Sequence, residues 1–102
     1  MSTIGEKWPF RDPENTAVFT TCFVIKDGHT IVHVSHDADD GAWQFHGGPT
    51  YELKDAMAVG LKTIVDLDPT VSELADLPLG WIAERSDRGQ AWRRVARESG
   101  RQ

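Results

Sequence analysis

Hydrophobic and polar positions alternate along two neighbouring segments in the first third of the chain. Residues 16–26 are rich in β-branched and aromatic side chains, which favour strands, and residues 29–36 continue the alternation. Between them stands Asp27-Gly28, a pair typical of two-residue hairpin turns because both positions tolerate positive φ. The pattern predicts a β-hairpin whose core face is formed by Phe19, Thr21, Phe23, Ile25, Val32, Val34 and His36.

Residues 42–46 predict a third strand, and its pairing with the second strand can be deduced. A loop at residues 38–41 gives two cross-strand pairs on the core face, Trp43 with His36 and Phe45 with Val34. A loop one residue longer would turn both aromatic side chains to the opposite face. Because burial of a Trp and a Phe is strongly stabilising, we expect the four-residue loop, with Gly41 at positive φ.

Apolar residues then recur at helical spacing, which predicts an amphipathic helix over about residues 51–66. Gly60 within it costs about 1 kcal/mol relative to Ala. Asp68 and Pro69 predict a short helical turn, because Asp caps a helix and Pro suits its first position. Residues 80–85 predict a fourth strand, whereas residues 90–97 fit either a helix or an extended segment.

These elements predict a single α+β domain over residues 16–88, in which an antiparallel sheet of about four strands packs against one main amphipathic helix with short extra helical turns. Residues 1–15 contain two prolines and predict an irregular arm. Because this arm carries Trp8 and Phe10, we expect it to dock on the domain. Residues 89–102 form an Arg-rich C-terminal segment.

Charge is distributed unevenly along the chain. Residues 1–87 hold 15 acidic and 6 basic side chains, whereas residues 88–102 hold five arginines and one glutamate. An acidic body disfavours non-specific nucleic-acid binding, so a nucleic-acid partner is not expected. No segment is apolar enough to suggest a membrane span or a signal peptide, and Cys22 stands alone. We therefore expect a cytoplasmic protein.

The segment between the second and third strands carries the candidate chemistry. His36, Asp37 and His46 could contribute to a metal or small-ligand site, although zinc sites generally use three or four firm protein ligands. Asp37, Asp39 and Asp40 do not have the spacing of an EF-hand loop, and Asp and Gly are common in ordinary turns. The sequence contains no complete catalytic set, so we expect no catalytic residue, resident metal or cofactor.

Large aromatic residues accompany this acidic segment. Trp43 and Trp81 are more typical of a core, but an aromatic patch bordered by carboxylates would suit a basic protein partner. The candidate binding residues are Asp37, Asp39, Asp40, Trp43, His36, His46, Trp81 and Arg85.

Three motifs resemble a known family: DDGAWQF at Asp39–Phe45, an LDP turn at Leu67–Pro69, and DLPLGWIAER at Asp76–Arg85. Together they are similar to small bacterial domains with a D-x-G-W-R/Q-F core, some of which are grouped with thirty-three-type immunity proteins of polymorphic toxin systems. The resemblance covers about residues 16–88 and rests on Asp40, Trp43, Phe45, Pro69, Pro78, Gly80 and Arg85.

The resemblance implies an intracellular binding protein that neutralises a toxin, with no catalytic residues. The sequence thus favours a non-enzymatic protein-binding domain whose partner is another protein, such as a basic toxin domain. The alternative is a small-ligand or metal-dependent enzyme that uses His36, Asp37 and His46. The oligomeric state is left open.

Overall fold

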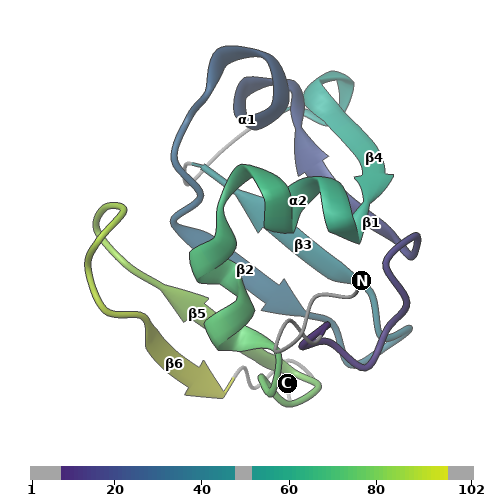
Figure 1. Cartoon of the computed structure of the whole chain (residues 1–102), viewed down its shortest axis with the longest axis vertical. Helices are drawn as coiled ribbons and strands as arrows, with labels where there is room; N and C mark the ends of the chain where they lie inside the picture. Colours follow the sequence, from purple (N-terminus) through teal and green to yellow (C-terminus); the bar gives the residue numbers. More distant parts are fainter. Residues whose placement is uncertain (1–7, 48–51, 97–102) are drawn as a thin grey trace, which may run out of the picture.

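The computed structural model describes residues 8–47 and 52–96. Six strands form one mixed sheet in the order β4-β1-β3-β2-β5-β6 (Figure 1). β1 and β3 run parallel, and every other neighbouring pair is antiparallel. The strands are β1 (Ala17–Thr21), β2 (His33–His36), β3 (Trp43–His46), β4 (Ala56–Gly60), β5 (Trp81–Glu84) and β6 (Arg93–Ala96). The predicted α+β class is confirmed, but the sheet is larger than predicted and not purely antiparallel.

The helical elements are short. They are α1 (Cys22–Asp27), α2 (Leu61–Leu67) and two 3₁₀ segments, η1 (Leu53–Asp55) and η2 (Pro69–Leu74). α2 crosses one face of the sheet (Figure 1), and its buried residues Leu61 and Ile64 belong to the hydrophobic core. Within the described ranges, none of these helices has the length and apolar character needed to cross a bilayer.

The predicted N-terminal hairpin is wrong. β1 ends at Thr21, whose hydroxyl accepts a hydrogen bond from the Val24 amide at 3.4 Å and so caps α1. Gly28 does have a positive φ of 72°, but it ends α1 and does not form a hairpin turn. The His29 amide donates to the Phe23 carbonyl at 3.1 Å, as in a common helix C-cap. A Gly that favours positive φ serves both structures, so the Asp-Gly signal alone could not distinguish them.

Consequently, the predicted core face of the first strand is also wrong. β1 pairs with β3 and β4, and neither pairing follows the assumed hairpin register. Val18 and Thr20 are fully buried, whereas Phe19 is 42% exposed. The predicted core positions Val34, Trp43 and Phe45 are buried as expected.

The predicted helix over residues 51–66 is only partly confirmed. Its start at residue 51 lies outside the described residues. Residues 53–55 form the 3₁₀ segment η1, residues 56–60 form β4, and the α-helical part begins only at Leu61, in α2. The short apolar run AMAVG fits a strand as well as a helix, and the open side of β1 supplies it with a hydrogen-bonding partner. Gly60 marks the change from strand to helix and does not lie within a helix.

Three local predictions are confirmed. β2 and β3 pair in the deduced register, with Trp43 opposite His36 and Phe45 opposite Val34. Asp68 caps η2 by accepting a hydrogen bond from the Thr70 amide at 3.0 Å. The predicted fourth strand is β5. For residues 90–97 the extended alternative holds, because Arg93–Ala96 forms β6.

The N-terminal arm docks on the sheet through its aromatic residues. Phe10 is 5% exposed and meets the Trp43 ring edge-on, with 5.3 Å between ring centroids. Trp8 packs against the same core, and its indole nitrogen donates to the Asp12 carbonyl. Trp8, Phe10 and Asp12 thus hold the described part of the arm against the sheet. Residues 1–7 of the arm and 97–102 of the Arg-rich segment lie outside the described ranges.

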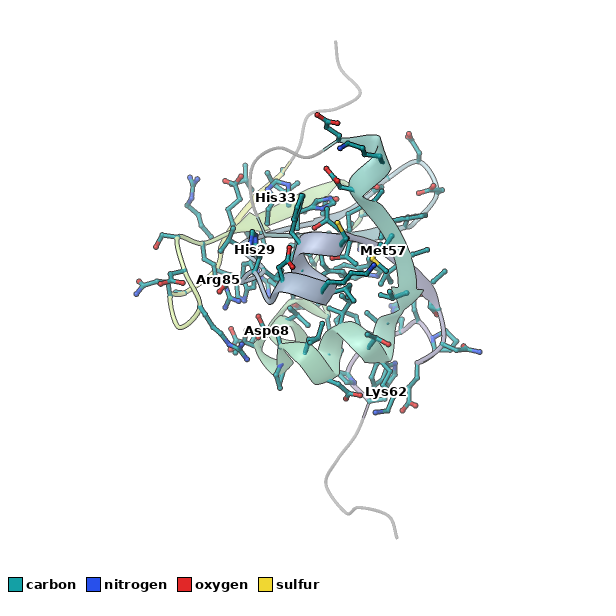
Figure 2. All side chains as sticks on the ribbon, turned by 90° about the horizontal axis from the view of Figure 1, so that it is seen from above. His29, His33, Met57, Lys62, Asp68 and Arg85 are labelled. Carbon is teal, nitrogen blue, oxygen red and sulfur yellow. The ribbon has the colours of Figure 1, made fainter. Side chains whose placement is uncertain are left out.

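A buried ion pair connects distant parts of the chain. The side chain of Arg85, which follows β5, is only 1% exposed, and its Nη2 donates to Asp68 Oδ2 at 2.7 Å (Figure 2). The Ile31 carbonyl accepts from Nε at 3.0 Å and from Nη2 at 2.9 Å. Nη1 donates to Thr70 Oγ1, and the Trp92 ring lies 4.0 Å from the guanidinium carbon. Because a buried charge requires a partner and hydrogen bonds, these contacts fix β5 against η2 and the segment before β2.

Arg85→Ala is expected to lower the free energy of unfolding by about 3–5 kcal/mol, because it leaves the buried carboxylate of Asp68 without its main counter-charge. Urea denaturation monitored by circular dichroism would measure this loss. The matched control is Arg88→Ala. The Arg88 side chain is 51% exposed and lies 3.6 Å from the same carboxylate, so its loss is expected to cost less than about 1 kcal/mol. If the two variants lost the same free energy of unfolding, Arg85 would not be the main counter-charge of Asp68.

Candidate functional site

The β2–β3 loop is a tight, regular turn that presents carboxylates. The Asp37 amide donates to the Ala42 carbonyl at 2.8 Å, which closes the predicted four-residue loop. Gly41 has a φ of 75°, as predicted, and its amide donates back to the Asp37 carbonyl. Asp40 Oδ1 accepts from the Ala42 amide at 3.0 Å. Asp39 and Asp40 are exposed, so this loop places two carboxylates at one end of the sheet.

His36 and Trp43 lie side by side at the same end of the sheet, on the core face. Their rings stack with 3.9 Å between centroids and an interplanar angle of 12°. His36 Nδ1 donates to the Leu77 carbonyl at 2.8 Å, which fixes the orientation of the imidazole. Trp43 is 2% exposed, and its Nε1 donates to Asp12 Oδ2 at 2.9 Å. Trp43 is therefore a core residue that also lines a groove at this end of the sheet.

A groove of about 630 Å³ lies between the N-terminal arm and the turn before β5. Its lining includes Pro9, Arg11, Asp12, His36, Trp43, Asp76, Pro78 and Leu79. The β2–β3 loop borders it, because Gly41 lines the groove and the Gly80 amide donates to the His36 carbonyl at 2.7 Å. Leu79 is 55% exposed. The groove thus combines aromatic side chains, the exposed apolar side chain of Leu79 and charged residues of both signs, namely Arg11, Asp12 and Asp76.

Asp76 shows how this border holds a cation. Arg94 Nη2 donates to Asp76 Oδ1 and to the Glu73 carbonyl, both at 2.8 Å. The hydrogen bond and positive charge of Arg94 lower the pKa of Asp76. A carboxylate and a backbone carbonyl therefore bind one guanidinium at the edge of the groove.

Asp37 and His46 belong to the opposite face of the sheet. Gln44 Nε2 donates to Asp37 Oδ2 at 2.7 Å, which leaves Gln44 Oε1 to accept from His46 Nε2 at 3.0 Å. His46 is buried. This burial, assisted by the nearby charge of His33 and partly opposed by Asp37, lowers the pKa of His46 from 6.5 to about 4. His46 is therefore a neutral donor at neutral pH.

His36 and His46 consequently do not share a site. His46 stands opposite His33, whereas His36 stands opposite Trp43, and successive residues of a strand point to opposite faces. Within the two described ranges, no three His, Cys, Asp or Glu side chains are grouped so that they could hold a metal ion. The geometry gives no support to a metal or small-ligand site built from His36, Asp37 and His46.

The two remaining candidate binding residues have different surroundings. Trp81 lies opposite His36 on β5, is partly buried and packs against the core. Arg85 is fully engaged in the buried network around Asp68, so its guanidinium serves the fold. Sequence reasoning missed Asp12, Asp76 and Leu79 as groove residues, because only long-range packing brings the arm and the turn before β5 to the β2–β3 loop.

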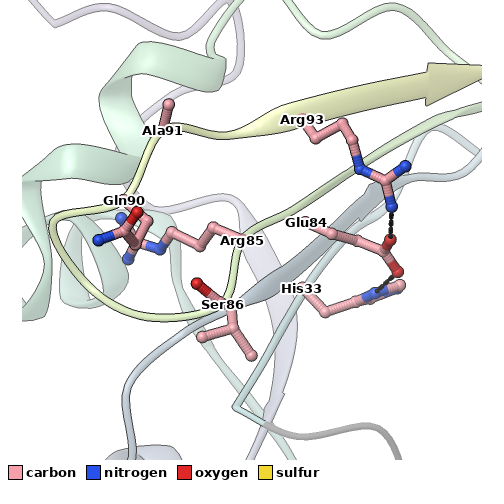
Figure 3. Close-up of a pocket in the computed structure, with 8 residues that line it drawn as sticks. His33, Glu84, Arg85, Ser86, Gln90, Ala91 and Arg93 are labelled. Atoms are coloured by element: carbon pink, nitrogen blue, oxygen red, sulfur yellow. Dashed lines mark hydrogen bonds and ion pairs between the residues drawn. The ribbon is translucent and has the colours of Figure 1, made fainter.

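A second cavity, of about 470 Å³, lies on the opposite face beside β5 and β6 (Figure 3). His33 Nδ1 lies 3.3 Å from Glu84 Oε2, and Arg93 Nη2 donates to Glu84 Oε1 at 3.2 Å. The deduced β2–β3 register already implied that His33 faces His46, but its link to Glu84 required the β2–β5 pairing. The first groove is the stronger candidate binding site, because its lining includes the exposed Leu79, whereas no large exposed apolar side chain among the described residues lines the second cavity.

Comparison with known proteins finds no matching family model, no similar curated protein and no similar solved structure.

His46 is expected to make the stability of the fold depend on pH. The unfolded chain binds a proton at His46 near pH 6.5, but the folded chain does so only near pH 4. Stability is therefore lost as the pH falls from about 6.5 to about 4, by up to about 3 kcal/mol from this residue. Urea denaturation at several pH values would show a weaker pH dependence for His46→Gln than for the unmodified protein. His29→Gln, at an exposed position on the loop after α1, is the control. Identical pH profiles for His46→Gln and the unmodified protein would contradict the prediction.

Proposed function

We propose that this protein is a non-enzymatic binding domain whose groove between the N-terminal arm and the turn before β5 receives a basic segment of another protein. The observation that supports this proposal is the composition of the groove. The half-buried His36 ring, held against the buried Trp43, lines the groove, and Leu79 offers an exposed apolar contact. Asp12 and Asp76 supply carboxylates within the same lining. Aromatic and apolar anchors with a charged rim are typical of protein-binding sites.

Electrostatics favour a basic partner. The chain carries a net charge of −5, and Asp39 and Asp40 extend the acidic border beyond the groove itself. Opposite charges on two proteins accelerate association and disfavour partners of like charge. Arg94 already binds Asp76 and the Glu73 carbonyl at the edge of the groove, so the basic partner is expected to meet the exposed carboxylates of Asp39 and Asp40.

The resemblance to immunity proteins suggests which class of protein the partner belongs to. If the similarity of the DDGAWQF and DLPLGWIAER motifs reflects a shared role, the basic partner is a toxin domain and the binding neutralises it in the cytoplasm. Binding alone is sufficient for such a role, because a bound protein can cover the active surface of a toxin without any chemical step. The enzymatic alternative at His36, Asp37 and His46 is not supported, since the two histidines lie on opposite faces of the sheet.

The double variant Asp39→Lys/Asp40→Lys is expected to weaken partner binding at least about tenfold and to reduce its dependence on salt, because it reverses the charge beside the groove. The tagged protein would first be used to isolate a stoichiometric basic partner from its own cells. Titration of the purified partner at two salt concentrations would then measure the dissociation constant for each variant.

The control is Asp27→Lys/Asp87→Lys, which makes the same change in net charge away from the groove. Asp87 also matches Asp40 locally, since its carboxylate accepts a hydrogen bond from a backbone amide in a turn. The control should bind nearly as well as the unmodified protein. Leu79→Ser tests the apolar contact without changing charge and should also weaken binding. Equal affinity for all the variants would remove the groove as the binding site.

A further inference from the structure

The two edges of the sheet differ in how they are protected. β6 carries Arg93 and Arg94, and charged side chains on an edge strand discourage further strand pairing. β4 forms the other edge (Figure 1), and its sequence AMAVG contains no charged residue and no proline. β4 therefore lacks two features with which edge strands avoid pairing with other chains, a charged side chain and a proline.

The backbone of β4 has hydrogen-bonding groups directed outward. The Leu61 amide donates to the Thr16 carbonyl at 2.8 Å, and the register continues from Gly60 opposite Ala17. Because hydrogen-bonded and non-hydrogen-bonded pairs alternate in an antiparallel ladder, Met57 and Val59 bond to β1. Ala56, Ala58 and Gly60 consequently direct their N–H and C=O groups away from the sheet. Within residues 8–47 and 52–96, no strand pairs with this side of β4.

The side chains next to this edge form an exposed apolar surface. Ala58 stands directly opposite Phe19, which is 42% exposed. Ala17 and Ala56 are exposed on the same face. The alanines at the edge are small, and the larger Phe19 ring lies one strand farther in. The side chains on this face therefore project less from the sheet at the edge strand β4 than on β1.

We propose that β4 is a dimerisation edge, where a second copy of this chain pairs antiparallel with it and extends the sheet across a two-fold axis. A strand that pairs antiparallel with its own copy satisfies the symmetry of an isologous dimer, because each copy contributes the same residues. The alanines of both copies then form a seam, and one Phe19 lies on each side of it. This arrangement covers apolar surface that the monomer leaves exposed.

Charges at the ends of β4 are compatible with a second copy. Lys54 and Asp55 precede the strand, and Lys62 follows it and forms an ion pair with Asp66 at 2.9 Å. In an antiparallel pair, the beginning of one β4 lies beside the end of the other. Both signs of charge therefore meet at each end, so the acidic character of the whole protein is not concentrated at this edge.

The dimer is independent of the groove. No residue of β1 or β4 lines the groove, so pairing at β4 leaves two grooves open in each dimer. Two binding sites on one particle would raise the apparent affinity for a partner that is itself multivalent. Failure of dimerisation would leave the proposed binding function untouched, and failure of binding would leave the dimer untouched.

Sedimentation equilibrium of the full chain over a range of concentrations would test the proposal. The unmodified protein is expected to form a dimer in a concentration-dependent manner. Ala58→Pro should raise the dimer dissociation constant at least about tenfold, because it removes one outward N–H from each copy. The substitution leaves the ladder with β1 intact, since proline is tolerated on an edge strand where its nitrogen faces solvent.

Ala58→Lys is the second variant, and it should also separate the copies by placing like charges near each other across the seam. If Ala58→Pro does not show the circular dichroism spectrum of the folded protein, Ala58→Lys provides the test of the dimer. Thr63→Lys is the control, because it adds the same charge at an exposed position on α2 and should leave the dimer unchanged. A monomer at every concentration would overturn the proposal, as would a dimer that survives in folded Ala58→Pro and Ala58→Lys variants.

Discussion

The buried ion pair between Arg85 and Asp68 is the interaction on which the arrangement of the fold depends most. It joins the end of β5 to the beginning of η2, and it uses the Ile31 carbonyl to include the segment before β2. A guanidinium can satisfy three segments at once because its donors are fixed in one plane. The same side chain lies against Trp92 and so contacts the segment leading into β6. With η2 and β5 held in this way, the turn between them is positioned to form one wall of the groove.

The sheet then separates two sets of polar chemistry. On the core face, His36 stacks on Trp43 and is held by the Leu77 carbonyl, at the border of the groove. On the other face, His46 is buried beside Gln44, within a polar row that includes His33 and Glu84. These residues are close in sequence, but the alternation of side chains along a strand separates them. His36 and His46 therefore do not contribute to one site.

Sequence reasoning succeeded where a local constraint had one good solution. The β2–β3 register followed from burying Trp43 and Phe45 together with a loop that Gly41 could close. The cap that Asp68 provides for η2 likewise depends on residues next to it in the chain. Reasoning failed for residues 22–27 and 56–60, which are short, apolar and compatible with either a helix or a strand. Their conformations depend on which neighbours the folded sheet offers, and one sequence window does not contain that information.

The sequence by itself determined that the chain forms an α+β fold, how β2 pairs with β3, and that carboxylates and aromatic residues are concentrated around the loop between them. Only the tertiary structure decided that β1 runs parallel to β3, that Arg85 is a buried structural residue, and that Asp12, Asp76 and Leu79 meet at one groove. The physical reason is the range of the interactions involved. Turn geometry and strand alternation act over a few residues, whereas the ion pair, the contact of the arm with Trp43 and the pairing of β1 with β4 join segments separated by 17 residues or more.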